Sequence, residues 1–162
     1  MTGTQPFRWG IIAPGRIAHN FASALSVVPD AELAAVASRN AARGQAFADQ
    51  YSTGGVSPRV YADYAELVQD PSIDAIYIAN PHRFHADSVA LCLAADKPVL
   101  CEKPLMVNAE QAQALFAVAE ARGVFLMEAL WSRFLPAWDQ VMQWLQADAI
   151  GTVHTIQSEF CF

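Results

Sequence analysis

The chain has 162 residues, a formal net charge of −6 and a pI near 5.0; 54% of its residues are hydrophobic and 16% are charged. This apolar content excludes a disordered chain, the acidic balance argues against a nucleic-acid-binding protein, and no apolar run is long enough to cross a membrane. The cysteines have no C-x-x-C spacing and the N-terminus has no signal-peptide pattern, so we expect a cytoplasmic protein without a metal site.

Apolar runs alternate with helical patterns along most of the chain. The runs predict strands at residues 9–13, 33–37, 60–61, 75–79, 98–101 and 124–127. Asn40, Asp63 and Asn108 occupy positions expected of helix N-caps, and Gly123 that of a helix end. Helices alternating with apolar strands indicate βαβ units around a parallel sheet covered on both faces. The predicted fold class is therefore α/β, a doubly wound parallel sheet of the Rossmann type, which binds nucleotides at its switch point.

The turn after the first predicted strand reads Ala13-Pro14-Gly15-Arg16-Ile17-Ala18. This is the spacing of the dinucleotide fingerprint G-x-G-x-x-G/A, with Ala13 in place of the first glycine. Gly15 would let the backbone approach a pyrophosphate, and the helix N-terminus would supply free N–H groups. The alternative is an ordinary Pro-Gly turn between a strand and a helix.

The second predicted strand ends in Ser38-Arg39, where an NAD-selective site usually carries an acidic residue for the ribose 2′-hydroxyl. Arg39 would instead pair with a 2′-phosphate, Ser38 would hydrogen-bond to it, and Arg43, one helical turn on, would add positive charge. This pattern favours NADP over NAD. The alternative is that Arg39 is an ordinary solvated arginine.

Cys101-Glu102-Lys103-Pro104 follows the fifth predicted strand, at the sheet edge where doubly wound folds bind ligands. Lys103 would exchange a proton with a substrate hydroxyl during hydride transfer, a role that requires burial or a nearby cation to favour the neutral amine. Glu102 would orient this amine, and Pro104 would fix the turn, with a cis bond as one option. The alternative is a polar turn without function.

Five segments in order resemble the glucose–fructose oxidoreductase (Gfo/Idh/MocA) family. They are Trp9-Gly10-Ile11-Ile12, the 13–18 turn, Asn80-Pro81-His82-Arg83-Phe84-His85, Glu102-Lys103-Pro104 and the segment 128–136, Glu-Ala-Leu-Trp-Ser-Arg-Phe-Leu-Pro. The last is similar to the branch that holds dimeric dihydrodiol dehydrogenases and NADP-dependent D-xylose dehydrogenases. The resemblance implies an NADP-dependent oxidoreductase acting on a sugar or diol. A non-catalytic dinucleotide-binding regulator of the same family is the alternative.

The resemblance also implies roles for individual residues. The cofactor-binding set would be Ala13, Gly15, Arg16, Ile17, Ser38, Arg39, Arg43, Asn80, Pro81, His82, His85, Glu102, Trp131 and Arg133. His85 would lie near the nicotinamide, Glu102 would contact its ribose, and Lys103 would be the catalytic acid/base. His82 and His85 have a spacing that also suits a metal pair, but no third ligand is evident, so we expect none.

The end of the chain alternates apolar and polar residues as a β-strand does. We therefore expect a dinucleotide-binding domain with a linker helix at residues 1–150 and the first strand of a second α+β domain at 151–162. Family members continue into such a domain, which carries substrate residues and usually the dimer interface. The expectation is thus a truncated chain of a homodimeric enzyme, with little turnover by itself.

Overall fold

In a computed structural model of the chain, residues 5–159 are described, and they form two compact units that divide between Ala129 and Leu130. The first unit contains six strands, a short 3-10 helix and five α-helices. In chain order they are β1 (Phe7–Ile12), α1 (Arg16–Leu25), β2 (Ala31–Ala37), α2 (Ala41–Gln50), β3 (Arg59–Tyr61), α3 (Tyr64–Gln69), β4 (Ala75–Ile78), η1 (His82–Phe84), α4 (His85–Ala94), β5 (Val99–Cys101), α5 (Ala109–Arg122) and β6 (Leu126–Glu128).

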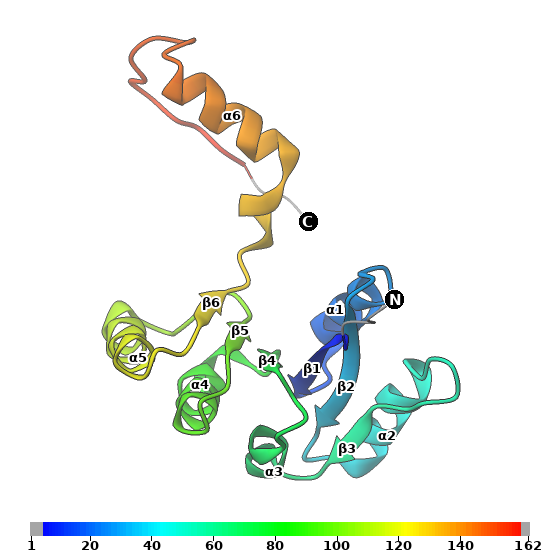
Figure 1. Ribbon diagram of the computed structural model, residues 1–162. Coiled ribbons are helices and arrows are strands. Elements are labelled where there is room, and N and C mark those ends of the chain that lie inside the picture. Colours follow the sequence, from blue (N-terminus) through cyan, green and yellow to red (C-terminus); the bar gives the residue numbers. More distant parts are fainter. Residues whose placement is uncertain (1–4, 160–162) are drawn as a thin grey trace. The chain divides into compact units, whose positions relative to one another are not determined.

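The six strands form one sheet in the order β3-β2-β1-β4-β5-β6, and each neighbouring pair runs parallel (Figure 1). Two hydrophobic clusters cover it: one contains buried side chains of α1 and α2, the other those of α3, α4 and α5. The order of the strands reverses between β1 and β4, which is the switch point of a doubly wound fold. The predicted Rossmann-type α/β class is confirmed.

The helix ends follow from the capping residues in the sequence. Asn40 and Asn108 accept hydrogen bonds from the backbone N–H groups of Arg43 and Gln111, and Asp63 accepts one from Ala65. Gly123 ends α5 in the left-handed conformation that glycine adopts without steric cost.

The buried face of α1 consists mainly of small side chains. Ala18 and Ala22 are buried there with Leu25, whereas Ile17 is 38% exposed. Small side chains on this face let the helix approach the sheet closely. Phe21 lies beside them, and its ring stacks on Tyr77 of β4 at a centroid distance of 3.9 Å.

A buried polar network lies at the amino end of the sheet around Asp70. Its carboxylate accepts hydrogen bonds from the Tyr61 hydroxyl and from the N–H and hydroxyl of Ser72, and it pairs with Arg59 at 2.6 Å. Lys97 donates from Nζ to the backbone carbonyls of Asp70 and Ile73. Burial alone would raise the pKa of Asp70, but these hydrogen bonds and the Arg59 charge outweigh it and lower the pKa to about 2.

Substitution Asp70→Asn is expected to destabilise the fold by about 2 kcal/mol near neutral pH, since the amide loses the charge-assisted bonds. Because the folded pKa is depressed, this contribution is complete above the unfolded pKa of about 4 and is lost as the pH falls toward about 2. Urea unfolding at stepped pH values measures it. The variant should show a flatter decline of stability over this interval; parallel pH profiles for the two proteins would contradict the assignment.

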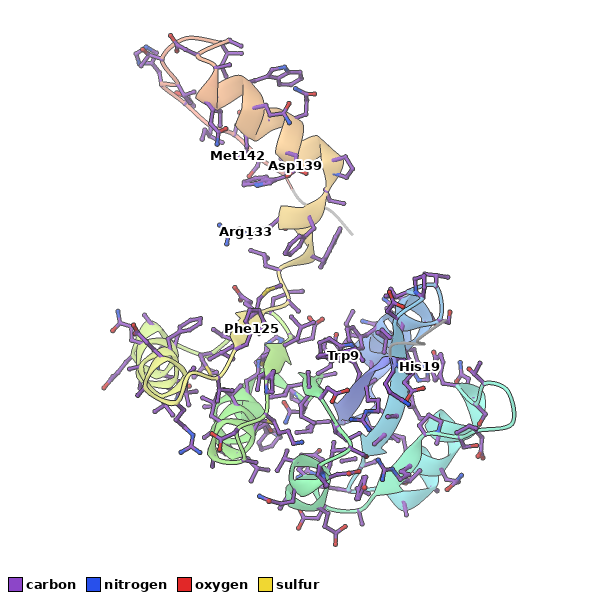
Figure 2. The ribbon with its side chains drawn as sticks, viewed as in Figure 1. Trp9, His19, Phe125, Arg133, Asp139 and Met142 are labelled. Carbon is purple, nitrogen blue, oxygen red and sulfur yellow. The ribbon has the colours of Figure 1, made fainter. Side chains whose placement is uncertain are left out.

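The second unit contains a 3-10 helix, η2 (Trp131–Phe134), and α6 (Pro136–Gln146). Trp138 and Trp144 of α6 are about half exposed, as is Trp131 of η2. Figure 2 shows the side chains of this unit, with Arg133, Asp139 and Met142 labelled. No helix among residues 5–159 is both long and apolar enough to cross a lipid bilayer.

The strand predicted at residues 151–162 is not formed in its described part. Residues 152–159 have no regular secondary structure, and residues 160–162 lie outside the described residues. An alternating pattern makes a strand only where a neighbouring strand accepts its hydrogen bonds, and none pairs with residues 152–159 in the described chain. The assignment of 151–162 to a second domain remains a prediction.

Candidate nucleotide site

The carboxyl ends of β1 and β4 lie side by side at the switch point of the sheet. β1 continues into α1 and β4 into η1 and α4, and these two connections belong to opposite faces because α1 and α4 pack in different hydrophobic clusters. Doubly wound sheets bind ligands outside the strand ends at such a switch point. Most of the residues predicted for the cofactor site lie on the loops around this edge.

The β1–α1 loop leaves its backbone open at Gly15. A Cβ atom built there would meet only the carbonyl oxygens of Ala79 at 3.7 Å and Ala13 at 4.0 Å, which are ordinary contacts. By contrast, a Cβ at Gly10 would meet the Ile76 Cδ1 at 2.9 Å, and one at Gly44 would meet the Val60 Cγ1 at 2.9 Å. A side chain at Gly10 or Gly44 would therefore force its packed neighbours to shift, whereas nothing in the fold itself requires glycine at position 15.

Ala13 and the start of α1 complete this loop. Ala13 has φ of +66°, in the left-handed region that glycine usually occupies, so its methyl group imposes a local steric cost. Gly15 is the N-cap of α1 and offers no side chain, so the first N–H groups of the helix have no side-chain cap. Arg16 and Ile17 follow, exposed in the first turn. Such a helix start has the free donors that bind phosphate oxygens.

Ser38 and Arg39 of the β2–α2 loop have different surroundings, although both were expected to bind the 2′-phosphate. The Ser38 hydroxyl is buried, donates to the Asn40 carbonyl at 2.8 Å and accepts from the Asn40 N–H at 3.2 Å, so it shapes the loop. Arg39 and Arg43 are exposed, and within residues 5–159 no carboxylate lies within ion-pair distance of either. Positive charge without an acidic partner in this part of the chain is therefore present at the end of β2.

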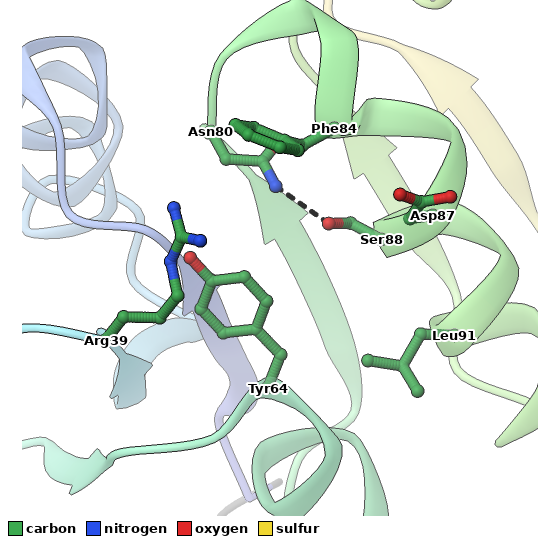
Figure 3. A pocket seen from close by; sticks show the side chains of 7 residues that line it. All are labelled: Arg39, Tyr64, Asn80, Phe84, Asp87, Ser88 and Leu91. Carbon is green, nitrogen blue, oxygen red and sulfur yellow. Dashed lines mark hydrogen bonds between the residues drawn. The ribbon is translucent and has the colours of Figure 1, made fainter.

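Arg39 also borders a pocket of about 250 Å³ that the sequence did not reveal (Figure 3). The lining residues are Arg39, Tyr64, Asn80, Phe84, Asp87, Ser88 and Leu91. The Arg39 guanidinium carbon lies 5.5 Å from the centroid of the Phe84 ring, and Arg83 lies over the same ring at 4.6 Å. The contact with Phe84, which also lines the pocket, holds the Arg39 guanidinium at its border. Among the lining residues, only Arg39 and Asn80 were predicted for the site.

Asn80 carries an unsatisfied acceptor at this pocket. Its side chain is buried, and its Nδ2 donates to the Ser88 Oγ at 2.7 Å (Figure 3). Its Oδ1 has no hydrogen-bond partner among residues 5–159. A buried amide oxygen without a donor is costly, so it indicates that a ligand or solvent donor is needed there. An orphaned acceptor, an unpaired arginine and an open glycine backbone together fit a dinucleotide.

Glu102 and Lys103 follow β5 at the same edge. Tyr77 of β4 donates its hydroxyl to Glu102 Oε1 at 2.5 Å, and Glu102 Oε2 accepts from the Lys103 N–H at 3.2 Å. Burial is the main cause that raises the pKa of Tyr77, and the neighbouring Glu102 carboxylate raises it further. The phenol therefore stays a donor. The Lys103 side chain is exposed, so the burial named as one way to favour its acid/base role is not found. The Lys103–Pro104 peptide bond is cis, which was one of the options for this turn.

The two histidines have different surroundings. His82 is exposed at the start of η1, beside the exposed Pro81. His85 is fully buried, and both of its ring nitrogens face backbone carbonyl oxygens: Nε2 that of Asn80 at 2.9 Å, and Nδ1 those of Pro104 at 3.0 Å and Leu105 at 3.1 Å. The ring is therefore not free to contact a cofactor, unlike the expectation for His85. No group of three metal-ligating side chains occurs among residues 5–159.

Comparison with known proteins agrees with this geometry. The profile of the oxidoreductase family with an NAD-binding Rossmann fold matches residues 7–130. The chain belongs to this family. Trans-1,2-dihydrobenzene-1,2-diol dehydrogenase of Mus musculus is 43% identical over 157 residues, which are 96% of this chain and 46% of that protein. The human protein of the same name is 40% identical over 94% of this chain and 45% of its own length.

Solved structures of oxidoreductases superpose on the same region. A 3-ketoreductase from Actinomadura kijaniata, crystallised with NADP, has a TM-score of 0.81 and 35% identity, covering 91% of this chain and 46% of that one. An NAD-binding oxidoreductase from Klebsiella pneumoniae has a TM-score of 0.79 and 30% identity, covering 90% and 40%. The chain spans about half the length of the relatives it matches.

In this family member, two predicted residues lie outside the first unit. Trp131 and Arg133 belong to η2 of the second unit, and their part in cofactor binding remains a prediction. Sequence reasoning missed Phe84, Tyr77 and Glu128. Phe84 lies between two predicted site residues and Glu128 stands within a family motif, but the apolar β4 run gave no reason to single out Tyr77.

Proposed function

We propose that this chain is the cofactor-binding part of an NADP-dependent oxidoreductase that transfers a hydride between nicotinamide and a carbinol carbon of a sugar or diol. The family and the dehydrogenase and reductase names of its relatives support the reaction class. NADP is favoured over NAD by the unpaired Arg39 at the end of β2. Bound NADP(H) would supply the hydride donor or acceptor.

The cofactor would be held by the loops at the carboxyl edge of the sheet. The N–H groups at the start of α1, with Gly15, Arg16 and Ile17, would bind the pyrophosphate. Arg39 and Arg43 would bind the 2′-phosphate, and the Arg39 pocket with Asn80 would accept the adenosine end. Ser38 would contribute by fixing the shape of the loop, because its own hydroxyl is already paired.

Lys103 would move the proton. In the oxidation direction its neutral amine takes the proton of the substrate hydroxyl as the carbinol carbon loses its hydride; in reduction its ammonium returns that proton to the carbonyl oxygen. Glu102, oriented by Tyr77, would bind the nicotinamide ribose next to it. A non-catalytic regulator would bind the cofactor but would not depend on Lys103 for any function.

The observation that carries this proposal is the open backbone at Gly15, which the fold does not need but a pyrophosphate does. Substitution Gly15→Ala should leave the free energy of unfolding within about 0.5 kcal/mol, because φ is −90° and the added Cβ meets only ordinary contacts. It should weaken NADPH binding about tenfold or more, since the methyl group occupies the path of the phosphate. Protein fluorescence titrated with NADPH measures this.

Ala13→Gly is the matched control in the same loop. It relieves a positive φ, so it should stabilise the protein by about 0.5–1 kcal/mol and should not weaken NADPH binding. Unchanged NADPH affinity in Gly15→Ala would contradict the placement of the pyrophosphate and, with it, the proposed function.

We also propose a cytoplasmic location, small-molecule substrates and a homodimer. A cytoplasmic location is supported by Cys92 and Cys101, which are buried free thiols whose pKa values burial raises, so neither is reactive. Small-molecule substrates fit the named relatives. A homodimer of the whole protein follows from the family resemblance alone, and sedimentation of the natural protein tests it.

A further inference from the structure

One peptide group lies between a histidine and a glutamate at the end of the loop that carries Lys103. The carbonyl of the Pro104–Leu105 peptide faces His85 Nδ1 at 3.0 Å, while the N–H of the same peptide donates to Glu128 Oε1 at 2.8 Å. His85 comes from α4 and Glu128 from the end of β6. The loop is therefore held from two sides through a single peptide, one residue after Lys103.

Both ring nitrogens of His85 lie against hydrogen-bond acceptors. Carbonyl oxygens only accept hydrogen bonds, and both ring nitrogens face them at 2.9–3.1 Å. Either neutral tautomer would leave one nitrogen lone pair against a carbonyl oxygen, and the ring is 0% exposed, so no bulk solvent replaces the missing donor. A ring that carries both protons donates on both sides.

Negative charge at the far end of the peptide favours that form. A carboxylate bound to the N–H polarises the peptide and makes its carbonyl oxygen a stronger acceptor for the imidazolium. The other ionisable groups around the ring and the loop are His82, whose ring centroid lies 5.4 Å away, Cys101, whose Sγ is 3.9 Å from the Leu105 carbonyl, and the side chains of Glu102 and Lys103. Burial raises the pKa of the Cys101 thiol, so it stays neutral and adds no charge.

We propose that His85 is an imidazolium which, together with Glu128, holds the Pro104–Leu105 peptide and thereby positions Lys103. Both are positioning residues rather than catalytic ones, because their contacts are to the loop backbone. The proposal rests on the proposed function only where it names Lys103 as the group that is positioned. It also gives a role to a fully buried histidine in a cofactor-like motif.

Nitrogen-15 NMR of the uniformly labelled chain tests the protonation directly. The His85 ring, assigned through backbone correlations, should show both nitrogens at protonated shifts with slowly exchanging protons at neutral pH. The exposed His82 ring serves as the internal comparison. A wide separation of the two His85 nitrogen shifts, as in a neutral ring, would overturn the proposal.

Glu128→Gln tests the link to the loop while preserving the shape of the side chain. The chain has two lysines, Lys97 and Lys103, so carbon-13 dimethylation of the amines gives two assignable lysine signals. We expect Glu128→Gln to shift the Lys103 signal and the His85 Nδ1 signal and to leave the Lys97 signal unchanged. Glu110→Gln, at an exposed position in α5, should shift none of them.

An unchanged Lys103 signal in Glu128→Gln would refute the positioning role even if NADPH binds as proposed. Failure of NADPH to bind would refute the proposed function and leave the NMR result intact. His85→Asn adds a second test, since an amide has only one donating end. It should shift the Lys103 signal in the same direction as Glu128→Gln, and a shift confined to the Lys97 signal would contradict the proposal.

Discussion

Replacement of Lys103 by methionine is expected to lower the rate of hydride transfer by about 10²–10⁴-fold, the usual contribution of a positioned acid/base. Methionine keeps much of the side-chain length and removes the amine, so the proton of the substrate hydroxyl has no acceptor. NADPH affinity should change by less than about threefold, because the phosphate-binding loops are untouched. The measurement is NADPH formation from NADP with a panel of sugars and trans-diols. The assay uses the protein expressed from the whole natural reading frame.

Lys97→Met is the matched control, since it removes the other lysine of the chain. Lys97 bonds to the carbonyls of Asp70 and Ile73 at the amino end of the sheet, whereas Lys103 lies at the carboxyl end. The Lys97 variant should lose stability and keep its rate of hydride transfer. Equal activity of Lys103→Met and the parent would contradict the acid/base role and would favour the non-catalytic regulator.

Substitution Arg39→Ala should weaken NADPH binding about 10–100-fold, which corresponds to the loss of charge-assisted bonds to the 2′-phosphate. NADH lacks that phosphate, so its affinity should change by less than about twofold. The reason lies in the surroundings of Arg39, which has a cation–π contact with Phe84 but no carboxylate partner among residues 5–159. Fluorescence titrations with both nucleotides measure the difference.

Two further variants make this test specific to Arg39. Arg39→Lys keeps the charge but loses the planar fork and the ring contact, so it should give an intermediate affinity for NADPH. Arg122→Ala removes an exposed arginine that pairs with Asp96 at the end of α5 and should leave both affinities unchanged. If the parent chain binds NADPH and NADH equally well, the role proposed for Arg39 is wrong.

Local chemistry explains which parts of the structure were predictable. Asn40, Asp63 and Asn108 cap their helices through bonds to residues two or three positions away, so the sequence alone placed those helix starts. The apolar strands and intervening helices likewise predicted a doubly wound sheet. The strand predicted at 151–162 required a partner strand, and for residues 152–159 no described strand provides it.

In the candidate site, too, only the features that local motifs encode were predictable. Motifs placed Gly15, Arg39 and Lys103 on loops after parallel strands, and parallel strands bring their carboxyl ends to one edge. The sequence does not show that both ring nitrogens of His85 contact backbone carbonyl oxygens, which belong to residues 5, 19 and 20 positions away in the chain. Such contacts depend on how α4 packs against the sheet, which no local pattern encodes.

The sequence by itself thus determined the fold class, the glycine turn, the arginine after β2 and the lysine after β5, because each depends on residues close together in the chain. Only the tertiary structure decided that Tyr77 holds Glu102, that Phe84 orients Arg39, and that one peptide lies between His85 and Glu128. The physical reason is that these side chains meet across different strands and helices, where packing sets the distances.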